Sequence, residues 1–274
     1  MARLGAGPRT GRVSVSRLDL EHSGITRTCR VYRPERLASP AGLVVMLHPT
    51  LGLGDDFANL TGFDQEAERL GWVAAYPDAL NPGPLGGWDT FACCPNDHDD
   101  VGFIAGLIAK IAGDSGLDPS RVFVAGFSRG GMMAHRVGCE LSPHVAGIAA
   151  VAGNMADPSG STEAVPCGPS RPIGVLIIHG SDDRVVPVEG GASPEYPELL
   201  PYAPLSDVVS RWRAENQCTE TAPVRQEGNV TIRRWDGDAP VELHLVIGGG
   251  HEWFAGAGQT IANFFAANPR RAGR

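Results

Sequence analysis

Four uninterrupted apolar runs constrain the fold of this chain more than any other feature. They are GLVVMLH (42–48), RVFVAGF (121–127), GIAAVAG (147–153) and PIGVLIIHG (172–180). Runs of this length without alternation are typical of strands that are covered on both faces. Helix-like segments separate them, so the sequence predicts an α/β fold in which helices flank a mostly parallel sheet.

The remaining elements fit the same layout. The alternating segments 13–20 and 26–33 predict an antiparallel N-terminal hairpin. Helices are expected over 60–70, 99–113, 129–141, 205–216 and 260–268, and further strands over 229–236 and 241–250. The chain has 274 residues, 42% of them apolar and 20% charged, which favours one globular domain over 1–274 with residues 1–11 flexible.

Composition excludes several classes of function. The net charge of -8 argues against a nucleic-acid partner, and no apolar run is long enough to span a membrane. Lys110 is the single lysine, which disfavours Schiff-base chemistry. Phosphate-binding and dinucleotide-binding glycine motifs are missing from the sequence, so no cofactor is expected. His98 lies beside Asp97, Asp99 and Asp100, but helix capping explains these acids better than a metal site.

One short motif points to catalysis. Residues 126–130 read G-F-S-R-G, a G-x-S-x-G, directly after a buried strand and before a helix. With 36 glycines in the chain the pentapeptide alone is weak, but a sharp strand-to-helix turn is where a serine nucleophile must lie. We therefore predict that Ser128 is a nucleophile; the alternative is an ordinary serine N-cap.

A serine nucleophile needs a base, and the base needs an orienting acid. In folds with such a turn, the three residues occur along the chain in the order serine, acid, histidine. His251 follows three glycines after a strand, at the end where ligands bind, whereas His244 falls inside the strand. His251 is the predicted base. The strand 172–180 runs into Asp182 and Asp183, and periodicity does not decide which of the two is the acid.

Several segments together resemble a known family. HGSDDRVVP (179–187) is similar to the H-G-x-x-D-x-x-V-P pattern of the polyhydroxybutyrate depolymerase and feruloyl esterase branch of the α/β-hydrolases, which includes acetyl xylan esterases of the carbohydrate esterase family 1 kind. Other segments between about residue 25 and residue 266 match the family in the same order along the chain, among them VVMLH, DPSRVFVAGFSRGGMMAHRVGCE and GGGHEWF. The resemblance implies that the acid is Asp183, and it predicts the triad Ser128, Asp183 and His251.

The oxyanion hole departs from the family pattern. The family usually has His-Gly where this chain has His48-Pro49, and Pro49 has no N–H to donate. We expect the Arg129 N–H as one donor and the Thr50 N–H as the other, with Leu51 as an alternative. Trp88 and Trp253 lie in loops expected near the site, where they are predicted either to wall a substrate pocket or only to cover core edges.

The six cysteines are Cys29, Cys93, Cys94, Cys139, Cys167 and Cys218. No two of them form a C-x-x-C motif, so a structural zinc site is not expected. They are compatible with free buried thiols or with disulfides in an exported protein. The resemblance implies a disulfide between Cys139 and either Cys93 or Cys94. It also favours secretion, although no leader is visible and a cytoplasmic location is the alternative.

Together these features predict a serine esterase without cofactor or metal. The expected partner is a small or oligomeric ester, first of the feruloyl type, with poly(3-hydroxybutyrate) oligomers and acetylated xylan as alternatives. A serine peptidase and a catalytically silent binding protein on the same fold are the rival interpretations. The sequence does not indicate an oligomeric state.

Overall fold

The computed structural model describes residues 13–80, 86–90, 98–113, 116–157, 167–197, 199 and 201–270. Residues 1–11, which were expected to be flexible, lie outside this set. The strands are β1 (Ser14–His22), β2 (Ile25–Arg33), β3 (Ala41–Leu47), β4 (Val73–Pro77), β5 (Leu117–Phe127), β6 (Gly147–Val151), β7 (Gly174–Gly180), β8 (Glu220–Thr221), β9 (Arg225–Glu227), β10 (Val230–Asp236) and β11 (Val241–Val246). The helices are α1 (Gly54–Thr61), α2 (Phe63–Leu70), α3 (Asp100–Ala112), α4 (Arg129–Glu140), α5 (Leu205–Glu215) and α6 (Ala257–Ala267).

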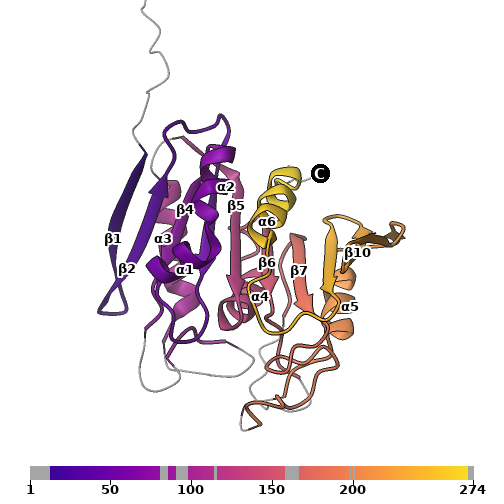
Figure 1. Cartoon of the computed structure of the whole chain (residues 1–274). Coiled ribbons are helices and arrows are strands. Elements are labelled where there is room, and N and C mark those ends of the chain that lie inside the picture. Colours follow the sequence, from indigo (N-terminus) through magenta and orange to yellow (C-terminus); the bar gives the residue numbers. More distant parts are fainter. Residues whose placement is uncertain are drawn as a thin grey trace, which may run out of the picture.

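Within the described residues, these strands form an 11-stranded sheet in the order β1-β2-β4-β3-β5-β6-β7-β11-β10-β8, with β9 paired to β10 (Figure 1). The pairs from β4 through β3, β5, β6 and β7 to β11 are parallel. The β1–β2 hairpin is antiparallel and joins β4 in antiparallel register, while β10 runs antiparallel to β11. The predicted mostly parallel sheet with an antiparallel N-terminal hairpin is confirmed.

Two hydrophobic cores lie on the two faces of the sheet. Helices α3, α4 and α5 contribute to one core, and α1, α2 and α6 contribute to the other. Successive side chains of a strand point to opposite faces, so the apolar run of β3 supplies both cores. Leu43, Val45 and Leu47 belong to the first, whereas Val44 and Met46 belong to the second. This explains why the central strands are apolar at every position.

The helix expected over 60–70 is two helices. Gly62 adopts φ 59°, ψ 19°, a left-handed conformation that ends α1, and its N–H donates to the Ala58 carbonyl. The same residue begins α2, whose buried Phe63 and Ala67 pack into the second core. Glycine adopts this left-handed conformation at little cost in conformational energy, and the conformation ends a helix. The break therefore follows from one glycine, which hydrophobic periodicity alone does not reveal.

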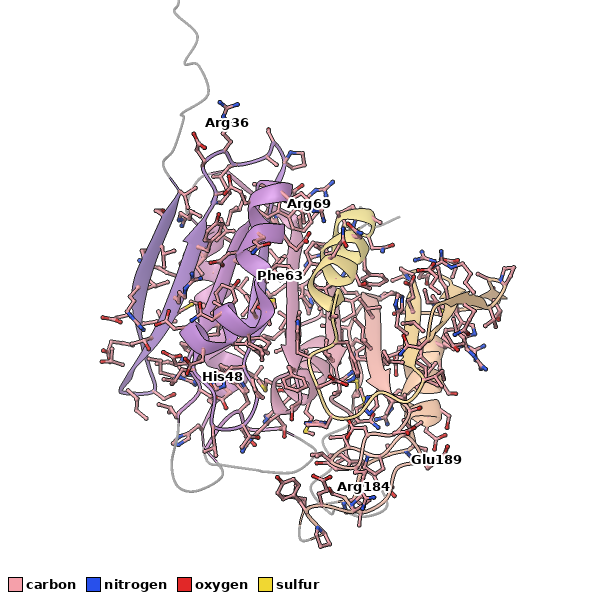
Figure 2. All side chains as sticks on the ribbon, viewed as in Figure 1. Arg36, His48, Phe63, Arg69, Arg184 and Glu189 are labelled. Carbon is pink, nitrogen blue, oxygen red and sulfur yellow. A yellow bond between two sulfur atoms is a disulfide. The ribbon has the colours of Figure 1, made fainter. Side chains whose placement is uncertain are left out.

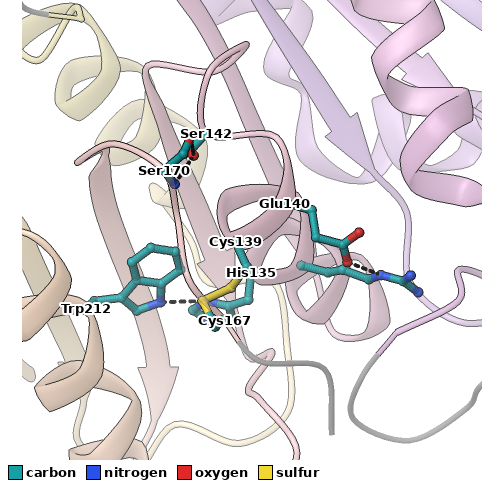
Figure 3. The surroundings of a disulfide bond; sticks show 8 residues. His135, Cys139, Glu140, Ser142, Cys167, Ser170 and Trp212 are labelled. Carbon is teal, nitrogen blue, oxygen red and sulfur yellow. Dashed lines mark hydrogen bonds and ion pairs between the residues drawn. A yellow bond between two sulfur atoms is a disulfide. The ribbon is translucent and has the colours of Figure 1, made fainter. Parts of the chain in front are cut away.

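A disulfide joins Cys139, in the last turn of α4, to Cys167, upstream of β7 (Figure 3). The prediction that Cys139 pairs with Cys93 or Cys94 was therefore wrong; those two residues lie outside the described part of the chain. The Ser142 hydroxyl accepts a hydrogen bond from the Ser170 N–H at 2.9 Å. This bond joins the segment after α4 to the segment before β7, close to the disulfide. Cys29 is a buried free thiol and Cys218 is partly exposed.

The bridge closes a loop with a sequence separation of 28 residues. Removing it in the double variant Cys139→Ala/Cys167→Ala should lower the free energy of unfolding by about 3 to 4 kcal/mol, because the unfolded chain regains the entropy of an open loop. The measurement is urea unfolding monitored by circular dichroism. Cys218→Ala is the control and should shift the urea midpoint far less; equal midpoints for the double variant and the wild type would contradict this role.

Candidate active site

The turn between β5 and α4 holds Ser128 in a strained conformation. Ser128 has φ 53° and ψ -121°, a region that side chains other than glycine rarely occupy. Its N–H donates to the Val151 carbonyl at 2.8 Å, and its own carbonyl accepts from Met132 at 3.0 Å. The serine therefore stands at the carboxyl end of the central strands, above the N-terminus of α4, where a nucleophile elbow places its hydroxyl.

Close packing allows only a glycine at Gly130, two residues after Ser128. A Cβ on Gly130 would lie 2.0 Å from the Leu47 carbonyl oxygen and 2.7 Å from that of His48. Because those contacts are with backbone atoms, neither partner can move aside cheaply. The first turn of α4 consequently lies directly against the segment that follows β3, and this brings the loop containing Thr50 close to Ser128.

Figure 2 shows which end of the sheet carries these loops. His48 and Arg184 lie toward one end, at which β7 also ends in Figure 1, whereas Arg36 and Arg69 lie at the opposite end. The loops after β7 and β11 meet there, because the Ser181 and Asp182 N–H groups donate to the Val246 and Gly249 carbonyls, each at 2.9 Å. Ligands of parallel sheets bind outside the carboxyl ends of the strands, so this is the functional end.

His251 links the two other predicted residues. Its Nε2 lies 2.8 Å from the Ser128 Oγ and its Nδ1 lies 2.8 Å from the Asp183 Oδ2. An Nδ1–H donated to the carboxylate leaves Nε2 as an acceptor for the serine proton. The histidine side chain is 17% exposed, so the base is reachable from solvent.

The structure places Asp183, and not Asp182, against the imidazole. Asp183 is buried, and its Oδ1 accepts hydrogen bonds from the Val185 and Val186 N–H groups at 2.9 and 2.8 Å. These bonds fix the carboxylate while Oδ2 faces His251. Asp182 is exposed and accepts a hydrogen bond from the Ser181 hydroxyl at 2.6 Å, on the outside of the same turn.

A second histidine lies behind the carboxylate. His179 is completely buried, and its Nε2 lies 2.8 Å from the Val186 carbonyl, to which it must donate, and 3.5 Å from the Asp183 Oδ2. Burial lowers its pKa, so it is neutral at neutral pH. Sequence reasoning gave His179 no role, although it is the first residue of the HGSDDRVVP segment.

The loop after β3 narrows the choice of oxyanion donor. The Leu51 N–H donates to the Gly86 carbonyl at 3.1 Å, so it is already used. Among the described residues none accepts a hydrogen bond from the Thr50 N–H. Arg129 is the first residue of α4, at the helix end where N–H groups favour negative charge. Thr50 and Arg129 thus remain the two candidate donors.

His48 braces this loop from within. Its Nδ1 lies 2.7 Å from the Pro49 carbonyl, and its Nε2 accepts a hydrogen bond from the Ala79 N–H at 2.9 Å. One nitrogen therefore donates and the other accepts, which requires the neutral imidazole. Burial lowers the pKa of His48 and favours that form. The side chain is structural, and no pattern in the sequence assigned it this role.

The two tryptophans occupy different environments. Trp88 is fully buried and donates from its indole Nε1 to the His48 carbonyl at 3.0 Å. Of the two roles expected for it, this burial favours covering a core edge over lining a substrate pocket. Trp253 is half-buried and makes edge contacts with the rings of Phe57 and Phe127, whose centroids are 5.5 and 6.3 Å away. The Phe127 ring lies 5.4 Å from that of His251, so one ring separates Trp253 from the predicted base.

The acidic segment around His98 caps a helix as expected. The Asp99 carboxylate accepts a hydrogen bond from the Gly102 N–H at 2.8 Å and forms the N-cap of α3. Asp100 instead forms a buried ion pair with Arg27 at 2.5 Å. Asp97 lies outside the described residues. Across the part of the chain that is described, no helix is long and apolar enough to cross a membrane.

Comparison with known proteins finds similarity to esterases. A family model described as Phospholipase/Carboxylesterase matches residues 103–196. Feruloyl esterase B of Piromyces equi is 30% identical over 219 residues, which make up 77% of this chain and 39% of that protein. The bifunctional acetylxylan esterase/xylanase XynS20E of Neocallimastix patriciarum is 24% identical over 221 residues, 77% of this chain and 28% of that protein.

The solved structure of the acetyl xylan esterase from Aspergillus awamori matches 92% of this chain and 99% of its own, with a TM-score of 0.68 and 19% identity. The chain has the α/β-hydrolase fold, and the relatives to which it is similar are named esterases. It spans less than half the length of either named relative, so the likeness concerns one part of each. This fold and the names of these relatives agree with the family that the sequence motifs resemble.

Buried neutral histidines make the stability of this α/β-hydrolase sensitive to acid. Burial lowers the pKa of His135 to about 3. The folded state therefore takes up fewer protons than the unfolded state below pH ~6.5, so the stability is present above that pH and is lost as the pH falls. Between pH 7 and 5, His135 alone should reduce the free energy of unfolding by about 2 kcal/mol.

The test is urea unfolding at pH 7 and pH 5 for wild type and His135→Gln. The variant should recover about 2 kcal/mol of the difference between the two pH values. His144→Gln, at an exposed position, is the matched control and should retain the wild-type difference. An unchanged difference in His135→Gln would show that this imidazole is not held neutral.

Proposed function

We propose that this protein is a serine carboxylic ester hydrolase that works through an acyl-enzyme, with Ser128, His251 and Asp183 as its catalytic triad. The observation that carries the proposal is the position of His251, whose two ring nitrogens lie 2.8 Å from the serine hydroxyl and 2.8 Å from a buried carboxylate. That arrangement supplies a base within hydrogen-bonding distance of the serine hydroxyl.

In the acylation step, His251 Nε2 takes the proton of Ser128 while Oγ bonds to the ester carbonyl carbon. The carbonyl electron pair moves onto oxygen, where the Thr50 and Arg129 N–H groups stabilise the negative charge. The intermediate collapses by breaking the bond to the alcohol oxygen, which receives the proton from His251. Asp183 keeps the imidazole oriented and stabilises its charged form.

Deacylation repeats the sequence with water. His251 removes a proton from the water as it attacks the acyl carbon, and a second oxyanion forms between the same N–H groups. The bond to Ser128 Oγ then breaks and the serine regains a proton from the imidazolium. The products are an acid and an alcohol, and the protein returns to its initial state. None of these steps needs a cofactor.

For the substrate we propose small or oligomeric esters, first of all feruloyl-type esters. A relative named feruloyl esterase B supports this choice, and the half-buried Trp253 near His251 offers a flat apolar surface for an aromatic acyl group. Leu51 and Leu53, which are 64% and 46% exposed, add apolar surface beside Thr50. Acetylated xylan is the second candidate, because two compared proteins are named acetyl xylan esterases.

We further propose that the protein is secreted. The disulfide between Cys139 and Cys167 supports this, since structural disulfides form and persist in oxidising compartments.

The two neighbouring aspartates give a matched pair of variants. Asp183→Asn should lower kcat for an aryl ester by about 10³- to 10⁴-fold, because the amide disfavours the imidazole tautomer that accepts the serine proton. Asp182→Asn changes the same chemical group one residue away and should stay within about threefold of wild type, since Asp182 faces solvent. Ser128→Ala should abolish measurable turnover. Equal losses in the two aspartate variants would contradict the assignment of the acid.

Substrate choice is tested by initial rates on methyl ferulate, acetylated xylo-oligosaccharides and a 3-hydroxybutyrate trimer, each with wild type and Ser128→Ala. We expect the highest kcat/KM on methyl ferulate, and we expect Trp253→Ala to reduce it more than it reduces kcat/KM for the acetyl ester. A preference for the acetyl ester or the trimer would overturn the feruloyl assignment while leaving the ester hydrolase in place.

A further inference from the structure

The segment Gly86–Trp88 contacts the loop after β3 at two points. The Gly86 carbonyl accepts the Leu51 N–H at 3.1 Å, and the Trp88 indole donates to the His48 carbonyl at 3.0 Å. These bonds lie on either side of Thr50, the candidate oxyanion donor. The Trp88 ring is fully buried and its centroid lies 5.1 Å from that of the His48 ring, so the segment packs against the loop where the loop leaves β3.

The same segment also holds the start of α4. The Arg129 Nε donates to the Trp88 carbonyl at 2.5 Å, and the arginine is only 2% exposed. Burial lowers the pKa of Arg129 to about 10, which still leaves the guanidinium charged at neutral pH. A charge-assisted hydrogen bond in a buried environment fixes its partner firmly. Trp88 thus contacts the second candidate donor through the side chain of the residue that carries it.

The segment is itself anchored away from the site. The Asp89 N–H donates to the Asp100 Oδ2 at 2.6 Å, and Asp100 forms the buried ion pair with Arg27. The Asp89 carbonyl accepts from Arg136 in α4 at 3.0 Å. Trp88 therefore lies on a fixed platform, and it connects two loops that come from different strands of the sheet.

We propose that Trp88 is a positioning residue for oxyanion stabilisation, setting the Thr50 and Arg129 N–H groups at the separation that the tetrahedral intermediate requires. The inference rests on the proposed function of the same site. Trp88 touches neither substrate nor the reacting atoms: its carbonyl holds the Arg129 side chain, and its indole holds the carbonyl two residues before Thr50. Donors aimed at a developing charge lose their effect when displaced by a fraction of an ångström.

The test variant is Trp88→Phe, which keeps a buried aromatic ring but removes the indole donor and part of the ring volume. For an aryl ester, kcat should fall by about 10- to 100-fold with little change in KM, because the lost stabilisation belongs to the transition state. The affinity of a trifluoromethyl ketone, whose adduct with serine carries an oxyanion, should fall by the same factor as kcat. The pH profile of kcat/KM should keep its shape, since His251 and Asp183 are not displaced.

Trp212→Phe is the matched control. Trp212 is also fully buried, and its indole makes a single hydrogen bond, to His135 Nδ1 at 3.1 Å, beside the disulfide (Figure 3). It should lower the melting temperature as Trp88→Phe does while leaving kcat within about twofold of wild type. Equal kcat losses in the two variants would reduce Trp88 to a structural residue.

A second variant keeps the inference testable if Trp88→Phe does not fold. Arg129→Met removes the side-chain donor but leaves the Arg129 backbone N–H, and it should lower kcat and trifluoromethyl ketone affinity in parallel; Arg129→Lys should restore part of both. Unchanged kcat in a folded Trp88→Phe or Arg129→Met protein would overturn the inference. Loss of the proposed function itself would appear differently, as a wild type that hydrolyses no ester.

Discussion

The whole site depends on the close approach of helix α4 to the end of β3. Gly130 lies so near the Leu47 and His48 carbonyls that only a glycine fits, and this contact sets the distance between the turn at Ser128 and the loop containing Thr50. The strained conformation of Ser128 is held by hydrogen bonds on both sides of the residue. The rigid strands thus hold Ser128 in its strained conformation while its hydroxyl remains accessible. Loops alone could not maintain this arrangement.

Two buried, neutral histidines, His48 and His179, support the residues of the site. His48 holds the loop containing Thr50 through one donated and one accepted hydrogen bond, and His179 occupies the space behind Asp183. Burial lowers the pKa of both, so neither adds positive charge beside His251. The proposed base, His251, is by contrast partly exposed. His48 and His179 are fixed donors and acceptors.

The sequence was most informative where one signal dominated. Continuous apolar runs predicted the parallel core because strands covered on both faces must be apolar throughout, and the strand-to-helix context predicted the turn at Ser128. Asp182 and Asp183 could not be separated by periodicity, since adjacent turn residues share the same local pattern and only the β7 and β11 loops together decide which faces His251. The partner of Cys139 and the burial of Trp88 also depend on contacts between distant segments, which no local pattern records.

The central claim is that Ser128 is the nucleophile of an acyl-enzyme. The most direct measurement is reaction of the intact protein with a fluorophosphonate, followed by intact-mass and peptide-mass analysis alongside an ester assay. The account predicts one adduct per chain, on the peptide containing Ser128, with ester hydrolysis lost in proportion to labelling. An adduct on another residue, or full hydrolysis by protein labelled at Ser128, would contradict it.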